Sequence, residues 1–161
     1  MLVFVRAITY ATLFIGFVLV TLPARTLSWA EVPAPTRWRA FQLAGMVVGA
    51  AGATLVIWCV VAFAHIGRGT PAPFDPPQGL VVGGPYGYVR NPMYLGAVLV
   101  LTGAACFYEA AVLWVYAGAF LALMHLIVVL YEEPALKQTF GDEYQTYCGH
   151  VRRWWPRPSR A

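Results

Sequence analysis

Residues 40–64 read A-F-Q-L-A-G-M-V-V-G-A-A-G-A-T-L-V-I-W-C-V-V-A-F-A, and this stretch decides the fold class. It contains no charged side chain. A helix needs about 20 apolar residues to cross a hydrocarbon core about 30 Å thick. The stretch therefore predicts a transmembrane helix over residues 40–64.

Three more apolar runs lie outside this stretch, at residues 2–22, 93–107 and 110–131, and the run at 93–107 is the shortest of them. The whole chain of 161 residues is 60% hydrophobic and 11% charged, with a mean hydropathy of +0.63. A soluble domain carries about 25% charged residues. The sequence predicts an all-α polytopic membrane protein, a single domain over residues 1–161 with four transmembrane helices. A cytoplasmic loop over 65–92 and an amphipathic helical cytoplasmic tail over 132–161 complete it.

The basic residues indicate how the chain is oriented. Four spans place both termini and the loop 65–92 on one side of the membrane, and cytoplasmic segments are enriched in Lys and Arg. The chain has a net charge of +4 and a pI near 9.2. The side with the termini carries Arg6, Arg68, Arg90, Lys137, Arg152, Arg153, Arg157 and Arg160, and the other side carries Arg25, Arg37 and Arg39. We therefore expect cytoplasmic N- and C-termini and a membrane partner, without nucleic acid.

Small residues in the second apolar run predict close helix packing. Gly45-Met-Val-Val-Gly49 has the spacing that lets two helix backbones approach each other. We expect this surface to pack inside the bundle, and a homo-oligomer is the alternative. The three cysteines and three histidines show no metal-ligand spacing, so no metal site is expected.

The first polar constellation lies in the loop 74–94, which reads F-D-P-P-Q-G-L-V-V-G-G-P-Y-G-Y-V-R-N-P-M-Y. Pro92 suits the first position of a helix, and Asn91 before it suits an N-cap. The free N–H groups of such a helix end bind anions. Because the following span is short, its start can lie in a recessed pocket. An ordinary capped helix start in a surface loop is the alternative.

The second polar constellation is Glu132-Glu133, which follows the apolar run 110–131. Adjacent helical side chains point about 100° apart, so we expect at most one of these carboxylates to face the bundle interior. A partly desolvated carboxylate suits a cationic or hydroxylated ligand. A solvated helix end, with a new helical segment from Pro134, is the alternative.

His125 and the tail complete the set of polar features. His125 lies seven residues before Glu132 and is expected to face the protein interior, where a structural hydrogen bond is the alternative to a catalytic role. Apolar residues from Leu136 to Val151 recur at helical spacing, which Gly141 interrupts. Two uses are open for the tail, which includes Arg152, Arg153, Trp154 and Trp155: an anchor at the membrane interface, or a lid across the pocket.

With both constellations in place, the chain resembles a known family. G-P-Y-G-Y-V-R-N-P-M-Y-L-G at 84–96 and E-E-P-A-L-K-Q-T-F-G-D-E-Y-Q-T-Y at 132–147 are similar to the isoprenylcysteine carboxyl methyltransferases and the related phospholipid methyltransferases. Those proteins carry an R-H-P-x-Y segment followed by an E-E pair. The likeness covers roughly residues 74–155. It implies S-adenosylmethionine as cofactor, bound on the cytoplasmic side by Gly79, Leu80, Val81, Val82, Tyr86, Arg90, Asn91, Pro92, Met93, Tyr94, Glu132 and Glu133.

Two departures from the family pattern bear on the chemistry. Asn91 stands where the family has His, and Val128 stands where the carboxyl methyltransferases have a basic residue one turn before the acidic pair. Prenylcysteine is therefore not the expected substrate. We expect methyl transfer to a lipid-like acceptor that enters from the bilayer. His125 is the candidate general base.

Two other functions compete with this interpretation. The C-terminal half also resembles membrane sterol reductases, which use NADPH, although those proteins are longer and Arg90 is the one evident partner here for a 2′-phosphate. A membrane scaffold or carrier without catalysis would bind no cofactor. Titration with S-adenosylmethionine and NADPH separates the three.

Overall fold

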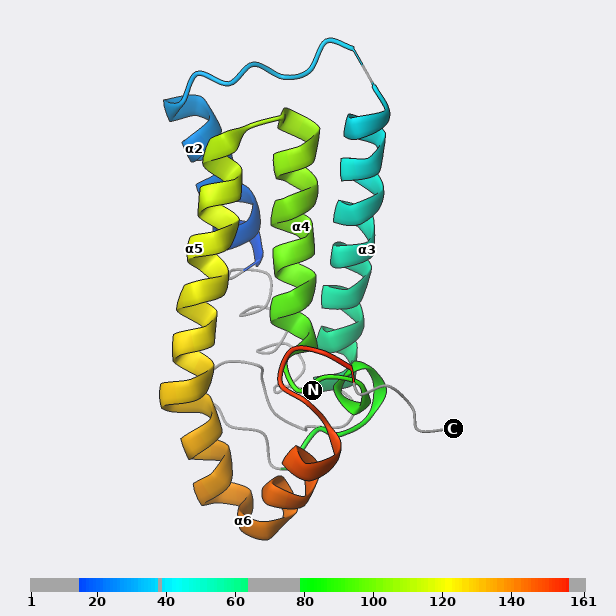
Figure 1. Ribbon diagram of the computed structural model, residues 1–161, viewed down its shortest axis with the longest axis vertical. Helices are drawn as coiled ribbons and strands as arrows, with labels where there is room; N and C mark the ends of the chain where they lie inside the picture. The colour runs from blue at the N-terminus through cyan, green and yellow to red at the C-terminus, as the bar shows by residue number, and fades with distance from the viewer. Residues whose placement is uncertain (1–14, 38, 64–78, 157–161) are drawn as a thin grey trace, which may run out of the picture.

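The computed structural model describes residues 15–37, 39–63 and 79–156, and this part of the chain is all-helical (Figure 1). An N-terminal helix is formed by η1 (Ile15–Thr21) and α2 (Leu22–Trp29). The later elements are α3 (Ala40–Ala62), η3 (Gly84–Gly87), α4 (Pro92–Tyr108), α5 (Ala111–Ile127), η4 (Val128–Glu132) and α6 (Glu133–His150). The all-α prediction is confirmed.

Two helices are long and apolar enough to cross a membrane. They are α3, with a mean hydropathy of 2.1, and the helix Ala111–His150, which is kinked at Gly141 and whose most apolar window averages 2.3. The helix α4 carries no charged residue, like α3, but it is shorter, as its apolar run predicts. The N-terminal helix runs on to Trp29, past the end of its apolar run at Leu22. Backbone hydrogen bonds keep residues 22–29 helical although their side chains are more polar than those before them.

Several expectations fall on residues outside the described ranges. These are the first part of the predicted span 2–22, the first half of the predicted loop 65–92, the end of the tail, and the basic residues Arg6, Arg68, Arg157 and Arg160.

The glycines of α3 pack against the glycines of α4 within this chain. A Cβ on Gly103 would lie 2.5 Å from the backbone nitrogen of Gly49. A Cβ on Gly52 would lie 2.6 Å from the carbonyl oxygen of Gly96. Such distances are below any normal contact, so the two backbones touch where side chains are missing. The predicted packing role of Gly45–Gly49 is confirmed, with α4 as the partner.

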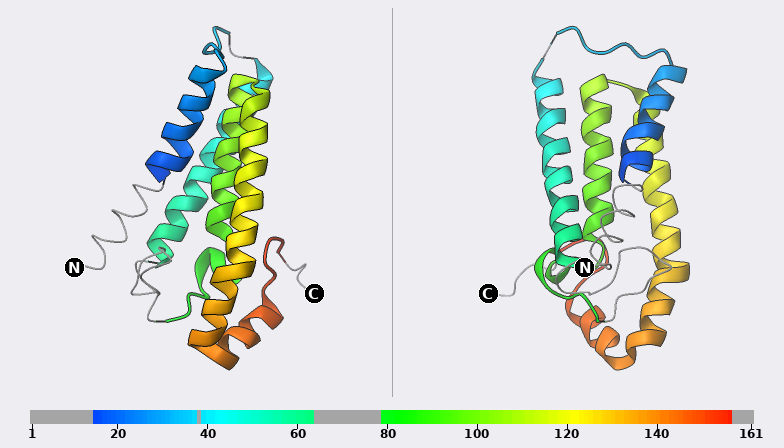
Figure 2. Two further views of the ribbon diagram at one scale, coloured as in Figure 1. Left: turned by 90° about the vertical axis from the view of Figure 1, so that its left-hand side faces the viewer. Right: turned by 180° about the vertical axis from the view of Figure 1, so that it is seen from behind.

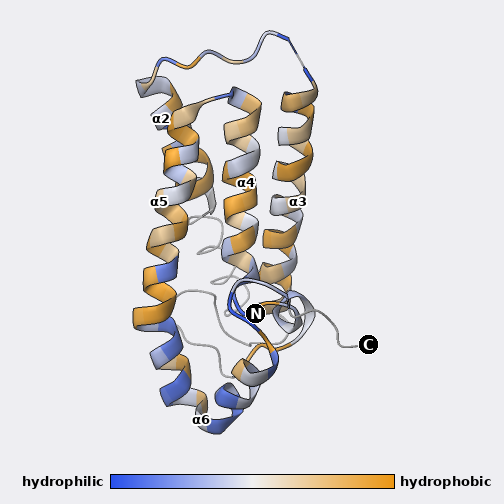
Figure 3. Cartoon of the chain, viewed as in Figure 1, coloured by the Kyte–Doolittle hydropathy of each residue, from blue (hydrophilic) through white to orange (hydrophobic). Residues whose placement is uncertain are grey.

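The helix α5 and the N-terminal helix close the other side of α4 (Figure 2). Leu19 belongs to a buried cluster with Leu101 of α4 and Phe120 of α5. Nearer the other end of the bundle, Leu27 packs with Leu113. Hydropathy is high along these helices and falls at α6 and in the connection between α2 and α3, so polar residues lie at the two ends of the bundle (Figure 3).

Candidate functional site

The candidate site lies where the N-terminus of α4 meets the end of α5. The hydroxyl of Tyr94, in the first turn of α4, donates a hydrogen bond to the carboxylate of Glu132. Glu132 ends η4, a π-helical turn that joins α5 to α6. Turns of this type inside α-helices often occur at functional sites. The two polar constellations, 38 residues apart at this contact, therefore form one site.

Glu133 is held by two arginines. Arg153 donates from both Nε and Nη2 to the two carboxylate oxygens, at 2.7 Å each. Arg90 approaches the same carboxylate from the loop, with its Nη1 3.1 Å from Oε1. Paired hydrogen bonds of this geometry are the strong form of an Arg–carboxylate contact. Although burial acts in the opposite direction, the hydrogen bonds and charges of the arginines lower the pKa of Glu133 below its ordinary value.

The guanidinium of Arg90 is partly buried and has several partners. Its Nη1 also lies 2.8 Å from the Cys148 sulfur and 3.5 Å from the Tyr144 hydroxyl, both on α6. Its Nε is buried and makes no hydrogen bond within the described residues. A buried N–H without a partner is costly, so this atom marks a place where an acceptor from a ligand would be stabilised.

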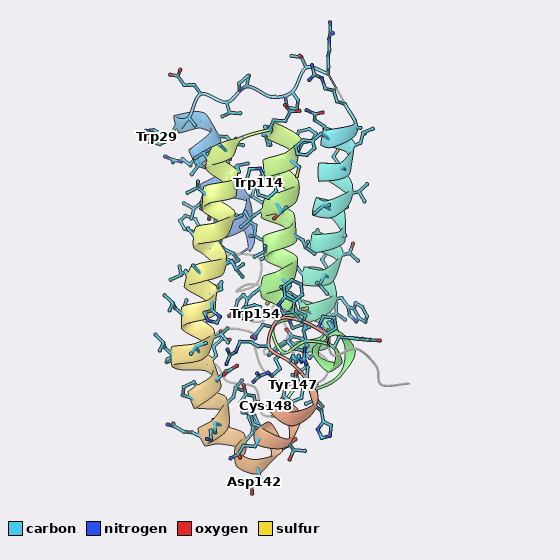
Figure 4. The ribbon with its side chains drawn as sticks, viewed as in Figure 1. Trp29, Trp114, Asp142, Tyr147, Cys148 and Trp154 are labelled. Atoms are coloured by element: carbon cyan, nitrogen blue, oxygen red, sulfur yellow. The ribbon has the colours of Figure 1, made fainter. Side chains whose placement is uncertain are left out.

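Residues 151–154, which we call the tail strap, cross the loop in front of α4. The backbone N–H of Arg90 donates to the carbonyl of Arg152 at 2.9 Å, and Val89 and Arg152 form an isolated parallel bridge. Asn91 donates from Nδ2 to the Arg153 carbonyl at 3.3 Å. Trp154, labelled in Figure 4, lies at the same end of the bundle as Tyr147 and Cys148. The strap thus covers the segment that leads into α4.

Asn91 occupies the predicted N-cap position, with Pro92 at the first position of α4. Its side chain makes no capping hydrogen bond, because it is turned toward the tail strap. The expected side-chain cap is therefore absent. Within the part of the chain that the structure describes, the first-turn N–H groups of α4 have no side-chain acceptor, which is the arrangement that favours an anion.

His125 does not lie where the sequence predicts. It is exposed on α5, and its Nδ1 accepts a hydrogen bond from Trp154 Nε1 at 3.2 Å. The expectation that it faces the bundle interior is wrong. The π-helical turn between His125 and Glu132 turns the chain less per residue than an α-helix does, so α-helical spacing does not predict which way the two side chains point relative to each other.

The two acids have different partners. Burial raises the pKa of Glu132; the hydrogen bond from Tyr94 opposes this shift and the charge of Glu133 adds to it. Glu133 turns to the arginines instead. The Glu133 side chain points about 100° away from that of Glu132. It still has a partner because Arg153 of the tail strap lies beside it.

The loop before α4 has a supporting part and an open part. Val81 and Tyr86 are buried against the end of α3, and the Tyr86 ring meets Phe63 edge to face at 5.2 Å. Tyr147 of α6 donates to the Tyr86 carbonyl at 2.7 Å. By contrast Val82 is 45% exposed. The partly buried residues around this core are Gly79, Leu80 and Met93, and Pro92 is fully buried.

The sequence predicted a lid as one of two roles for the tail but no contact for its individual residues. Arg153, Tyr144, Tyr147 and Cys148 all contact the candidate site or its loop. The sequence contained a signal for Arg153. Two adjacent acids at a membrane boundary need cationic partners, and Arg153 follows the next helix. The sequence positions of Tyr144, Tyr147 and Cys148 do not predict that these residues contact Arg90 or Tyr86.

The described residues define a class: an all-helical protein with two helices long and apolar enough to cross a membrane and a polar cluster at one end. The sequence profile of the phospholipid methyltransferase family matches residues 41–143, and the chain belongs to this family. A Haemophilus influenzae protein described as uncharacterized is 32% identical over 62 residues, which cover 38% of this chain and 98% of that protein. The family implies methyltransferase activity, and together with the two apolar helices it indicates a membrane location.

Proposed function

We propose that this protein transfers a methyl group from S-adenosylmethionine to a lipophilic acceptor within the membrane. One observation carries the proposal: the Tyr94–Glu132 contact joins the first turn of α4 to the acidic pair. These two segments are the ones that match the methyltransferase pattern, and the structure brings them to one end of the bundle.

The donor set fits this cofactor. The methionyl part of S-adenosylmethionine carries a carboxylate, which matches the uncapped N–H groups of α4 and the unpartnered Nε of Arg90. Its amino group and ribose hydroxyls are hydrogen-bond donors, which match the Glu132 carboxylate. Glu133 is already held by two arginines, so we assign it to supporting the site.

The cofactor, when bound, supplies an activated methyl group on a sulfonium. The residues of the site have to bind the cofactor and the acceptor and orient them. Alignment of methyl donor and acceptor can by itself lower the reaction barrier by about 7–11 kcal/mol. Tyr94 fixes the orientation of Glu132 through its hydroxyl, and the tail strap fixes Asn91. His125 is exposed and hydrogen-bonded to Trp154, so we assign it no chemical step.

We propose that the acceptor reaches the site sideways from the bilayer, since the site lies at the end of apolar helices. Val128, which is buried, gives no positive charge for a substrate carboxylate. This favours a neutral or cationic lipid-like acceptor over prenylcysteine.

The test uses purified protein in detergent and titration calorimetry with S-adenosylmethionine. We expect heat with the wild-type protein and about a hundredfold weaker binding for Glu132→Ala, because a charge-assisted contact is lost from a partly buried site. Glu143→Ala is the matched control, an exposed acid on α6. Lipid extracts of cells that overproduce the protein should contain a species heavier by one methylene.

Two results would contradict the proposal. Heat with NADPH and none with S-adenosylmethionine would favour the reductase. If the protein binds neither S-adenosylmethionine nor NADPH, and Glu132→Ala has no effect on it, the scaffold or carrier would be favoured.

A further inference from the structure

The tail strap contacts three segments at this end of the molecule. Its side chains reach Glu133 at the start of α6 and His125 on α5. Its carbonyls accept from the Arg90 backbone and from the Asn91 side chain. A chain end that merely rests on a membrane surface needs none of these contacts. The strap is therefore built into the site.

Arg153 is the residue that joins these contacts. Its guanidinium binds Glu133 through two hydrogen bonds, while its own carbonyl accepts from Asn91. One residue thus ties the acidic pair to the segment in front of α4. Its side chain is 31% exposed and the Glu133 side chain 19%, so the pair lies partly out of water.

We infer that Arg153 is a positioning residue for the cofactor site, and that the tail strap is one wall of that site. This inference rests on the proposed function and extends it to a segment outside residues 41–143, the part matched by the family. By holding Asn91 away from the helix end, the strap leaves the first-turn N–H groups of α4 open to an anionic group. By holding Glu133, it fixes the helix on which Glu132 lies.

The neighbouring residues of the strap have a different role. Among the described residues, Arg152 accepts a hydrogen bond through its backbone carbonyl, and its side chain is exposed. Trp155, which follows the strap, is 77% exposed. These side chains remain available for the membrane interface, where Trp and Arg are favoured. The lid and the anchor predicted as alternatives are thus separate faces of one segment.

The contrast between Arg153 and Arg152 provides a matched experiment. We compare Arg153→Gln, Arg153→Lys and Arg152→Gln with the wild-type protein by two measurements on the full chain in detergent. The first is hydrogen exchange of a peptide containing the Arg90 amide, without cofactor, which reports whether the strap is docked. The second is the dissociation constant of S-adenosylmethionine.

For Arg153→Gln we expect faster exchange at the Arg90 peptide and a dissociation constant raised about tenfold. Arg153→Lys keeps the charge but cannot make the paired contact, so its effect should be intermediate. Arg152→Gln should match the wild-type protein in both measurements. A thermal unfolding curve for each variant checks that the protein is folded at the temperature of the titration.

Unchanged affinity in Arg153→Gln would overturn the inference, whether or not exchange increases, because the strap would then be structural only. Equal losses in Arg152→Gln and Arg153→Gln would also overturn it. If the wild-type protein binds no S-adenosylmethionine, the proposed function fails. The exchange measurement then still decides whether Arg153 docks the strap.

Discussion

Glu132 and Glu133 are adjacent in the sequence, yet their surroundings differ. Glu132 meets a tyrosine hydroxyl, and burial keeps its pKa above the ordinary value. Glu133 meets two arginines, and its pKa is lowered. A carboxylate that is costly to keep ionised is suited to a cationic ligand, whereas one that is already paired stabilises the fold.

This difference predicts the pH dependence of stability for Glu133→Gln. A carboxyl whose pKa is lowered on folding contributes stability above its unfolded pKa, and that contribution is lost as the pH falls through the folded pKa. At pH 7 we expect the variant to be less stable by about 1–2 kcal/mol, a modest value because Arg153 is partly exposed. Chemical unfolding followed by fluorescence measures it.

The difference in the free energy of unfolding between Glu133→Gln and the wild-type protein should disappear as the pH falls below 4.5, the ordinary pKa of this carboxyl. Glu143→Gln, at an exposed position of α6, should show little difference at any pH. A gap that stays constant down to the acid limit would show that Glu133 is not ionically paired.

At the scale of helices, the bundle depends on the contact between α3 and α4. Their glycines let the backbones approach so closely that Cβ atoms at Gly52, Gly96 or Gly103 would overlap the facing helix. This contact sets where α4 begins relative to the end of α3. The loop that carries Tyr86 and Val81 packs on that end, so the helix contact also positions the loop.

Substitution of glycine by alanine tests the helix contact. Gly103→Ala places a methyl group 2.5 Å from the backbone of α3, and overpacking of this type costs about 1–3 kcal/mol. Gly118→Ala is the control, because its Cβ on α5 meets nothing within 4 Å. Thermal unfolding in detergent should show a lower midpoint for the first variant and an unchanged or slightly higher one for the second.

If Gly103→Ala unfolds at the wild-type temperature, α3 and α4 do not pack as closely as described. A comparable loss in Gly118→Ala would point to a detergent effect instead of to the contact between α3 and α4.

At the scale of the molecule, the polar site and the loop at residues 30–37 lie at opposite ends of the helices (Figure 1). The excess of basic residues at the end that carries the site predicts that this end is cytoplasmic. Such a location gives the site access to a water-soluble cofactor from one side and to a lipid from the surrounding bilayer.

Cysteine labelling tests this orientation. Thr36→Cys and Asp142→Cys place exposed thiols at the two ends. We expect a membrane-impermeant maleimide to label Thr36→Cys in intact cells and Asp142→Cys only after lysis. The wild-type protein, whose described cysteines are buried or partly buried, is the control. The reverse pattern, or labelling of both in intact cells, would contradict the predicted orientation.

The helices of the bundle could be predicted from the sequence because their signal is local. Apolar runs mark α3, α4 and α5, Pro92 marks a helix start, and Gly141, with φ of 50°, interrupts α6 as expected. The family resemblance rests on two short motifs, each readable within one segment, and the profile match confirms it.

The composition of the site was only partly predictable. The sequence by itself determined the helical class, the main helix positions and the two polar segments, since side-chain hydropathy and turn residues act within a few positions of the chain. Only the tertiary structure decided that Asn91 turns to the tail strap, that His125 lies on the surface, and that Arg153 binds Glu133. These contacts join segments about 20 to 60 residues apart, and they depend on a π-helical turn and a reversing tail whose geometry no local pattern encodes.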